Sequence, residues 1–355
     1  DIVTTIDREI QFAAEQALRK AMQTTGAAGG SIVVLDPATG AILAMASFPG
    51  LDLNDRSAVT PSVLRNRAVS DMYEPGSTLK VLTIAAALEE GIVRSDTLID
   101  TPRSIEIGNF TYHDIGRHPE QMAVSDVVAY SSNIGTINIQ QLLGRDLHYQ
   151  YLTEFGLGLQ AGLDVEGERQ GSVPAPPQWT ATTGSSVSIG YAVHTTLLQM
   201  AAVYATVANN GVWTEPYLVR EIIQPDGTRI ITSPRSRRVL SPETAVSVRS
   251  MLGLVIEKGT GTRAALSDYT AGGKTGTTNK FDVERAVYSD DTFASFIGMA
   301  PLNDPRVVVA VVLDTPRGKL PDGTSLSLGG ASAAPVFSEV AQNALHQLGV
   351  APDQD

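Results

Sequence analysis

The chain has 355 residues, of which 43% are hydrophobic, so it is long enough to bury a sizeable core. Its formal net charge of −12 argues against nucleic acid as a partner. The chain has no cysteine and therefore no disulfide, which fits a protein that folds outside the cytoplasm without disulfides. No apolar run approaches the roughly eighteen residues of a membrane span, and residues 307–313, among the longest, have only strand length. The histidines show no metal-like spacing, so we expect no metal and no cofactor: His113, His118, His148, His194 and His346.

The first elements in the chain are predicted to be a helix and a hairpin. Residues 7–23 form an amphipathic helix in this prediction, because apolar residues recur at helical spacing and share one face: Ile10, Ala14, Ala17, Leu18 and Ala21. Residues 31–36 and 41–47 are apolar and flank the turn sequence Pro-Ala-Thr-Gly, which predicts a β-hairpin.

The first motif with chemical content is Ser77-Thr78-Leu79-Lys80. It follows Glu-Pro-Gly and opens an Ala/Leu-rich run that ends at Gly91, so we expect Ser77 at a helix N-terminus. Lys80 then lies on the same helix face, one turn on. The positive end of the helix dipole disfavours an ammonium there and favours negative charge on the serine oxygen. Lys80 is therefore a candidate base for Ser77, although a plain N-cap serine beside a solvated lysine would give the same pattern.

The second motif, Ser131-Ser132-Asn133, separates two apolar helical segments at 124–130 and 134–143. We expect a corner between two helices, in which the Ser131 hydroxyl relays a proton. The Asn133 amide can bind both the lysine and a substrate backbone. An ordinary turn that caps the second helix is the alternative. The span from 77 to about 210, including 195–208, is predicted to be mostly helical, apart from a Gly/Pro-rich loop at 164–179.

The third motif is Lys274-Thr275-Gly276-Thr277. Small and β-branched residues around it predict an exposed strand at 270–277 that another backbone could approach, and an edge strand protected by its lysine is the alternative. Further strands are expected at 219–223, 292–299 and 306–313, and a final helix at about 334–348. The polar loops 279–291 and 316–328 border this region and either gate a peptide or merely connect strands.

These elements predict an α/β (α+β) fold with a central antiparallel sheet flanked by helices and an all-helical subdomain. Strands from both chain ends form the sheet, covered by the first and last helices, and the active site lies between sheet and helices. Because the motifs span 77 to 277, residues 1–355 are expected to act as a single catalytic domain. Its sheet subdomain would comprise about 1–70 and 215–355, and its helical subdomain about 77–210.

Taken together and in this order, the three motifs resemble those of the transpeptidase domain of class B penicillin-binding proteins. The likeness covers essentially the whole chain, and the region 73–91 looks closer to division-type members. Further stretches resemble the same family: Thr4–Asp7, Leu35–Met45, Arg67–Val69, Ile189–Tyr191, Asn209–Gly211, Ala294–Pro301 and Ala334–Phe337.

The resemblance implies a penicillin-binding-protein/serine β-lactamase-like fold and a D,D-transpeptidase that cross-links peptidoglycan stem peptides through a serine acyl-enzyme. β-Lactams, which mimic the D-Ala-D-Ala end, would inhibit it covalently. Ser77 is then the nucleophile, Lys80 the general base, and Ser131 and Asn133 the proton relay and substrate clamp. The implied carboxylate site contains Lys274, Thr275, Gly276 and Thr277, and the backbone N–H groups of Ser77 and Thr277 form the oxyanion hole.

The family also implies a location on the extracytoplasmic face of the membrane, with glycosyltransferase and cell-division partners. Its members carry an N-terminal anchor helix and a pedestal, and Asp1 stands about where their catalytic domain begins. Two alternatives stay open, a serine β-lactamase and a non-catalytic β-lactam sensor domain. Glu166 and Glu168 lie in a plausible loop for the deacylating base of a lactamase, but the asparagine that follows this glutamate in class A enzymes is absent, which favours a structural role for both.

Overall fold

The computed structural model describes residues 1–51, 54, 57, 59–116, 118–163, 165–282 and 284–354. Position 164, the first of the loop predicted at 164–179, lies outside the described residues, as do position 283 within the predicted loop 279–291 and position 355 at the chain end.

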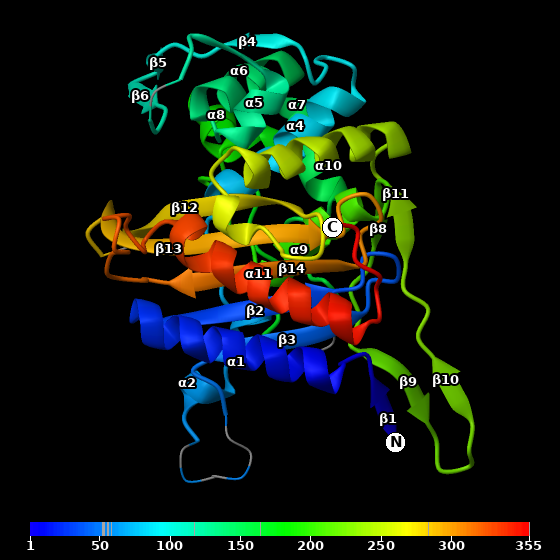
Figure 1. Ribbon diagram of the computed structural model, residues 1–355. Helices are drawn as coiled ribbons and strands as arrows, with labels where there is room; N and C mark the ends of the chain where they lie inside the picture. Colours follow the sequence, from blue (N-terminus) through cyan, green and yellow to red (C-terminus); the bar gives the residue numbers. More distant parts are fainter. Residues whose placement is uncertain are drawn as a thin grey trace.

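A five-stranded antiparallel sheet forms the centre of the molecule (Figure 1). Its strands come from both ends of the chain, in the spatial order β12 (Gly272–Asp282), β13 (Val287–Ala300), β14 (Val307–Asp314), β2 (Gly29–Leu35) and β3 (Ile42–Phe48). The predicted hairpin is the β2–β3 pair. Nearly every residue of β2 and β14 is buried, because helices cover both faces of the sheet.

Two long helices cover one face of this sheet, as predicted: α1 (Arg8–Thr25) and α11 (Gly329–Gln347). Asp7 caps α1 by accepting hydrogen bonds from two backbone N–H groups, and all five residues expected on its apolar face are buried. Helix α11 begins five residues before the predicted start, because the backbone N–H of Gly329 donates to Thr277 Oγ1 and fixes the helix start against β12.

Strand pairing corrects two predictions, one outside the central sheet and one within it. Residues 219–223 do form a strand, β9 (Val219–Ile223), but it pairs with β1 (Ile2–Thr4) and β10 (Arg229–Ile231) in a separate sheet. A further pair joins β11 (Ser236–Arg238) to β8 (Val212–Thr214). The predicted loop at 279–291 is also wrong, since β12 and β13 extend into it and pair as far as Asp282 and Val287.

Most of the helical part lies beyond the β12 edge of the sheet, whereas α9 (Leu197–Ala208) packs on the face opposite α1 and α11, against β14, β2 and β13 (Figure 1). The helical part also contains α4 (Lys80–Glu89), α5 (Val124–Ala129), α6 (Asn133–Leu143), α7 (Arg145–Glu154) and α8 (Thr183–Ser188). Short helical turns are α2 (Pro61–Leu64), α3 (Arg67–Ser70), η2 (Gly76–Thr78), η3 (Pro176–Gln178) and η4 (Thr262–Ala264).

The prediction of an all-helical subdomain is wrong in one segment. Residues 98–123 form two antiparallel pairs, β4 (Leu98–Asp100) with β7 (Gln121–Ala123), and β5 (Ser104–Ile107) with β6 (Phe110–His113). The sequence Ser-Ile-Glu-Ile alternates polar and apolar residues with the period of a strand. This alternation indicates a strand rather than a helix in this segment.

Helix α10 (Pro242–Glu257) was not predicted at all. It contacts β12 on one side and α5 on the other, so it joins the sheet to the helical part (Figure 1). Ser241 accepts a hydrogen bond from Thr244 N–H and a proline occupies the first turn. A Ser-Pro-Glu start of this kind is a recognisable helix signal.

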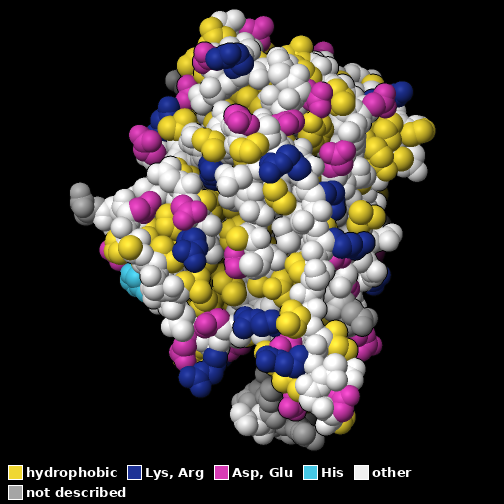
Figure 2. Space-filling model, turned by 90° about the vertical axis from the view of Figure 1, so that its right-hand side faces the viewer, with side chains coloured by type: hydrophobic (Ala, Val, Ile, Leu, Met, Phe, Trp, Pro, Cys, Tyr) yellow, Lys and Arg dark blue, Asp and Glu magenta, His cyan; other side chains and the backbone are white. Residues whose placement is uncertain are grey.

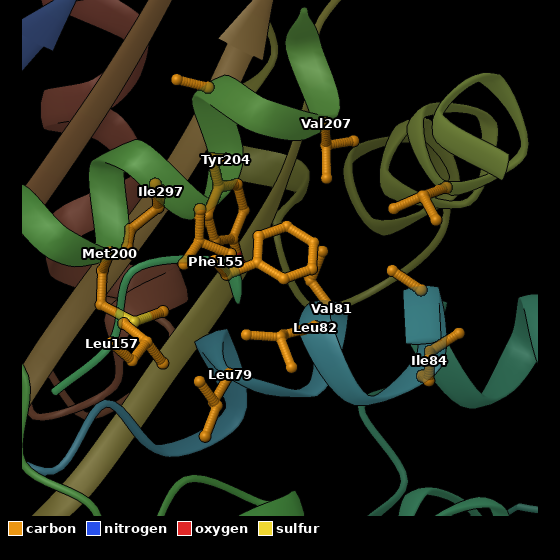
Figure 3. Packing of buried hydrophobic residues seen from close by; sticks show 14 of the residues in the cluster. Leu79, Val81, Leu82, Ile84, Phe155, Leu157, Met200, Tyr204, Val207 and Ile297 are labelled. Atoms are coloured by element: carbon orange, nitrogen blue, oxygen red, sulfur yellow. The ribbon is translucent and has the colours of Figure 1, made fainter. Parts of the chain in front are cut away.

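The core beneath the first motif is tightly packed (Figure 3). Leu79, Leu82, Phe155 and Tyr204 are all at most 1% exposed, and they belong to one buried cluster. The Tyr204 hydroxyl donates to the carbonyl of Thr78 at 2.9 Å. Helix α4 and the turn before it are therefore anchored from below by α9.

One face of the molecule shows no patch of a single charge. On the face drawn in Figure 2, basic and acidic side chains of the described residues are interspersed rather than gathered into one patch. Within the described ranges, no helix combines the length and hydrophobicity of a transmembrane segment.

Candidate active site

One cleft of about 280 Å³ brings the three predicted motifs together. It opens between β12, the corner joining α5 to α6, and the loop before α11. Its lining consists of Ser77, Ile115, Tyr130, Ser131, Asn133, Thr260, Thr262, Arg263, Thr275, Thr277, Thr324, Leu328, Gly330 and Ala331. The predicted loop 316–328 contributes two of these residues, so it borders the cleft.

Ser77 lies in η2, and this turn runs directly into α4, because Leu79 between them has helical dihedral angles of φ −73° and ψ −21°. The expected helix N-terminus is thus present. Two contacts fix the turn, one with the segment after α8 and one with the sheet. The backbone N–H of Gly76 donates to Gly190 O at 3.0 Å. On β12, a Cβ at Gly276 would lie 2.3 Å from Ser295 Oγ and 3.0 Å from Thr78 Cγ2, so only glycine permits this close approach.

Gly190→Ala is expected to displace Ser77. Gly190 has φ +82°, and an added Cβ would lie 2.1 Å from Gly76 O and 2.4 Å from Gly76 N, both rigid backbone atoms. Because a misplacement of about 1 Å can cost about a hundredfold in rate, we expect acylation of Ser77 to fall by ten- to a hundredfold. The measurement is the second-order rate of labelling by a fluorescent penicillin.

Gly91→Ala is the matched control for this prediction. Gly91 also has a positive φ, +66°, but nothing lies within 4 Å of its Cβ position. It should cost about 1 kcal/mol of stability and leave the labelling rate within about twofold of the wild type. Equal rates for both variants would show that Gly190 does not position the serine.

Lys80 is buried beneath the cleft and is 1% exposed. Its Nζ donates to Ser131 O at 2.6 Å and to Asn133 Oδ1 at 2.7 Å, and it lies 3.3 Å from Ser131 Oγ. Burial lowers the pKa of Lys80 to about 7, against an opposing effect of the Asp114 carboxylate. A neutral amine has two N–H bonds and one lone pair. The two carbonyl acceptors use the N–H bonds, which leaves the lone pair to receive a proton.

The second motif forms the predicted corner. Ser131 has φ +61°, in the left-handed region, and Ser132 is the N-cap of α6, accepting from Gly135 N–H. Asn133 Nδ2 donates to His113 O at 2.9 Å, which leaves its second N–H available to a ligand. This amide therefore contacts Lys80 and lines the cleft at the same time.

The third motif lies on β12 at the edge of the central sheet, as predicted, but it is not exposed. Residues Gly272–Gly276 are buried because η2 and α10 pack against the strand. Lys274 is 0% exposed and does not line the cleft. Burial, and after it the nearby charge of Lys80, hold the pKa of Lys274 well below its usual value. The threonines Thr275 and Thr277 do reach the cleft.

Several site residues escaped the sequence analysis. Thr260 Oγ1 lies 2.6 Å from Thr275 Oγ1, and the guanidinium of Arg263, which lines the cleft, donates to Asp322 at 3.0 Å. Asp114 lies behind the second motif and accepts a hydrogen bond from Ser132 Oγ at 2.6 Å. These residues stand in turns and irregular segments without a periodic pattern, and only chain folding brings them into the cleft or next to it.

The two candidate lactamase residues lie elsewhere. Neither Glu166 nor Glu168 lines the cleft. Glu168 accepts hydrogen bonds from the backbone N–H groups of Gly162 and Leu163, so it fixes its own loop. Over the part of the chain that the structure describes, no group of three histidine or acidic side chains is arranged to hold a metal ion.

Known proteins are similar to this chain over nearly its whole length. Residues 30–342 match the family model "Penicillin binding protein transpeptidase domain". The penicillin-binding protein PbpB of Mycolicibacterium smegmatis is 38% identical over 364 residues, which cover 98% of this chain and 55% of that protein. The probable peptidoglycan D,D-transpeptidase PbpC of Pseudomonas aeruginosa is 33% identical, over 99% of this chain and 60% of its own length. The chain thus spans about half to three fifths of these relatives.

A similar solved structure is that of penicillin-binding protein 3 from Mycobacterium tuberculosis complexed with ampicillin. It superposes with a TM-score of 0.93 at 35% identity, covering 100% of this chain and 80% of the other. The transpeptidase domain of Burkholderia pseudomallei penicillin-binding protein 3 gives a TM-score of 0.85 at 29% identity, over 99% of this chain and 98% of the other. These matches confirm the predicted fold and the predicted family resemblance.

Proposed function

This chain belongs to the family of penicillin-binding protein transpeptidase domains, and from that premise we propose that it is a serine D,D-transpeptidase that cross-links peptidoglycan stem peptides. The observation that carries the proposal is the meeting of Ser77, Ser131, Asn133, Thr275 and Thr277 in one cleft above the buried amine of Lys80. We further propose that residues 1–355 act as one catalytic unit, since the cleft takes side chains from both the sheet and the helical part.

The reaction begins when Ser77 Oγ attacks the carbonyl carbon of the penultimate D-alanine. A carbon–oxygen bond forms, and the hydroxyl proton moves to the lone pair of Lys80. The carbon–nitrogen bond to the terminal D-alanine then breaks, and Ser131, 3.3 Å from Lys80 Nζ, passes a proton to the leaving amine. An amine on a second stem peptide attacks the ester, its proton returns to Ser77 Oγ through the same groups, and the cross-link is complete.

Backbone donors stabilise the negative charge that develops on the carbonyl oxygen. We assign this role to the N–H groups of Ser77 and Thr277, and loss of one such donor typically costs about a hundred- to a thousandfold in rate. The Thr275 and Thr277 hydroxyls hold the terminal carboxylate, and Asn133 binds the peptide backbone. Lys274 and Gly276 contribute from below, the first as a buried amine behind the threonines and the second by allowing η2 to approach β12.

The test is covalent labelling. A fluorescent penicillin should add once per chain, on the tryptic peptide that contains Ser77, and Ser77→Ala should abolish the adduct. Intact-mass spectrometry with peptide mapping makes the measurement. An adduct on another residue, or an undiminished adduct on Ser77→Ala, refutes the assignment of the nucleophile.

The lifetime of the adduct distinguishes the transpeptidase from a β-lactamase. We expect it to persist for hours, because Glu166 and Glu168 lie outside the cleft and no other described acidic residue lines it as a deacylating base. Hydrolysis within seconds would indicate a lactamase. Formation of cross-linked product from a stem-peptide donor and an amine acceptor separates the transpeptidase from a sensor domain, which would acylate only.

The cellular role follows the same proposal. We propose action on the extracytoplasmic face of the bacterial membrane, beside glycosyltransferase and division partners. Complementation with the complete gene in a depleted strain tests this role, since restored septation supports a division enzyme and restored rod shape an elongation enzyme.

A further inference from the structure

A buried carboxylate that the reaction above does not use lies directly behind the second motif. The Asp114 side chain is 3% exposed. It accepts hydrogen bonds from Ser132 Oγ at 2.6 Å, from the backbone N–H of Asn133, and from the backbone N–H of Ile134 at 3.1 Å. The carboxylate therefore binds the first turn of α6 and both residues that follow Ser131.

A histidine fixes this carboxylate from the other side. His118 Nε2 lies 2.8 Å from Asp114 Oδ2, and its Nδ1 lies 2.8 Å from the carbonyl of Pro119. A carbonyl and a carboxylate can only accept, so both contacts are hydrogen bonds when both ring nitrogens carry a hydrogen, that is, when His118 is an imidazolium paired with Asp114. Because His118 is only 11% exposed and held at both nitrogens, it orients the carboxylate.

The corner held in this way has an unfavourable backbone shape. Ser131 has φ +61°, a conformation that costs a residue with a side chain roughly 1–2 kcal/mol. In this shape, Ser131 O and Asn133 Oδ1 both accept hydrogen bonds from Lys80 Nζ. Something must compensate for the strained turn, and the three hydrogen bonds to Asp114 are directly next to it.

We propose that Asp114, oriented by His118, is the positioning residue of this active site, which holds the Ser131–Asn133 corner so that it presents two acceptors to Lys80. The inference rests on the proposed function, since it concerns how Lys80 is prepared to accept a proton from Ser77. Asp114 does not line the cleft and acts through the residues it binds.

The charge of Asp114 has a second, measurable effect. It raises the pKa of Lys80 and so partly offsets the larger lowering caused by burial. Among the described residues, Asp114 is the charged group that acts on the pKa of Lys80, the buried amine of Lys274 lies nearby, and Asp114 in turn faces His118. Asp114→Asn removes the carboxylate charge but keeps an oxygen acceptor, so the pKa of Lys80 should fall further.

The experiment is the pH profile of Ser77 acylation by a fluorescent penicillin, from pH 5 to pH 9. For Asp114→Asn we expect the rate at pH 7.5 to fall by about ten- to a hundredfold, as for a displaced reacting group. The rising acid limb should move to lower pH, because Lys80 loses its proton earlier. Asp7→Asn is the matched control, since Asp7 also binds backbone N–H groups at a helix start but lies on α1, away from the cleft.

His118 supplies an independent arm in case Asp114→Asn does not fold. His118→Ala should lower the rate by about tenfold, and His118→Gln, which can still donate to Asp114, should restore most of it. Melting curves of all variants accompany the rates. An Asp114→Asn enzyme with the wild-type rate, or with a lower rate and an unmoved acid limb, overturns the proposal. A His118→Gln enzyme no faster than His118→Ala overturns the orienting role of His118.

The wild-type adduct distinguishes a failure of the proposed function from a failure of the role proposed for Asp114. The wild-type chain is first mapped for its adduct at Ser77, and the variants are compared only as ratios to it. An absent wild-type adduct refutes the transpeptidase assignment, whereas a normal wild-type adduct with unchanged variants refutes only the role of Asp114.

Discussion

Lys80→Met is expected to lower the rate of Ser77 acylation by about a hundred- to ten-thousandfold, the range that a positioned general base contributes. Methionine fills a similar volume but cannot accept a proton. It also leaves Ser131 O and Asn133 Oδ1 without their donor, at 2.6 and 2.7 Å in the wild type. Stopped-flow labelling with a fluorescent penicillin measures the loss.

The pH dependence makes this prediction specific. Burial lowers the pKa of Lys80 to about 7, so the amine is protonated and inactive as a base below that pH and becomes active above it. The wild-type rate should therefore rise with pH through about 7, and the residual rate of Lys80→Met should lack this limb. A variant that retains the limb would show that another group is the base.

A control separates lost chemistry from lost structure. Lys20→Met also removes a lysine, but Lys20 is exposed on α1 and pairs with Glu339 at the surface, so its labelling rate should equal that of the wild type. Lys80→Met should remain folded. Near pH 8 the Lys80 amine is protonated in the unfolded chain but mostly neutral in the folded chain, so folding must release a proton, and this free-energy cost is absent in the methionine variant. A collapsed melting curve for Lys80→Met would make the rate uninformative, and Lys80→Gln would then replace it.

Phe296→Ala is expected to lower the free energy of unfolding by about 3–5 kcal/mol, the cost of emptying a large core site. Phe296 is 0% exposed on β13, and its ring centroid lies 4.8 Å from that of Phe337 on α11. In the sheet register it stands opposite Thr275 of the third motif. The cavity therefore opens between β13 and α11, next to β12, the strand that forms one wall of the cleft. Urea denaturation followed by fluorescence gives the stability difference.

Phe12→Ala is the matched control for the core variant. Phe12 lies on α1 and is 58% exposed, so its truncation should change stability by no more than about 0.5 kcal/mol. A loss below about 1 kcal/mol for Phe296→Ala would contradict the packing described between β13 and α11.

Local sequence determined the regular elements wherever periodicity and caps agreed. The helix at 8–25 has an aspartate N-cap, five predicted core residues and a glycine after its last turn, and all of these act locally. The β2–β3 hairpin and the corner at Ser131-Ser132-Asn133 were likewise readable, because turn chemistry belongs to consecutive residues. The predictions failed at 98–123, where short strands within a helical region depend on which partner each strand finds.

The tertiary structure decided what each motif residue can do. Both Lys80 and Lys274 were legible as site residues, but only chain folding buries them and suppresses their charge, since desolvation depends on neighbours from η2, α10 and β12. Likewise, nothing local marks Asp114 or Thr260, which reach the site because backbone segments far apart in the chain meet there. The amino-acid sequence alone therefore determines the order and identity of the motifs. The protonation of their lysines and the contacts that support them arise from packing, because burial and side-chain pairing depend on the tertiary structure.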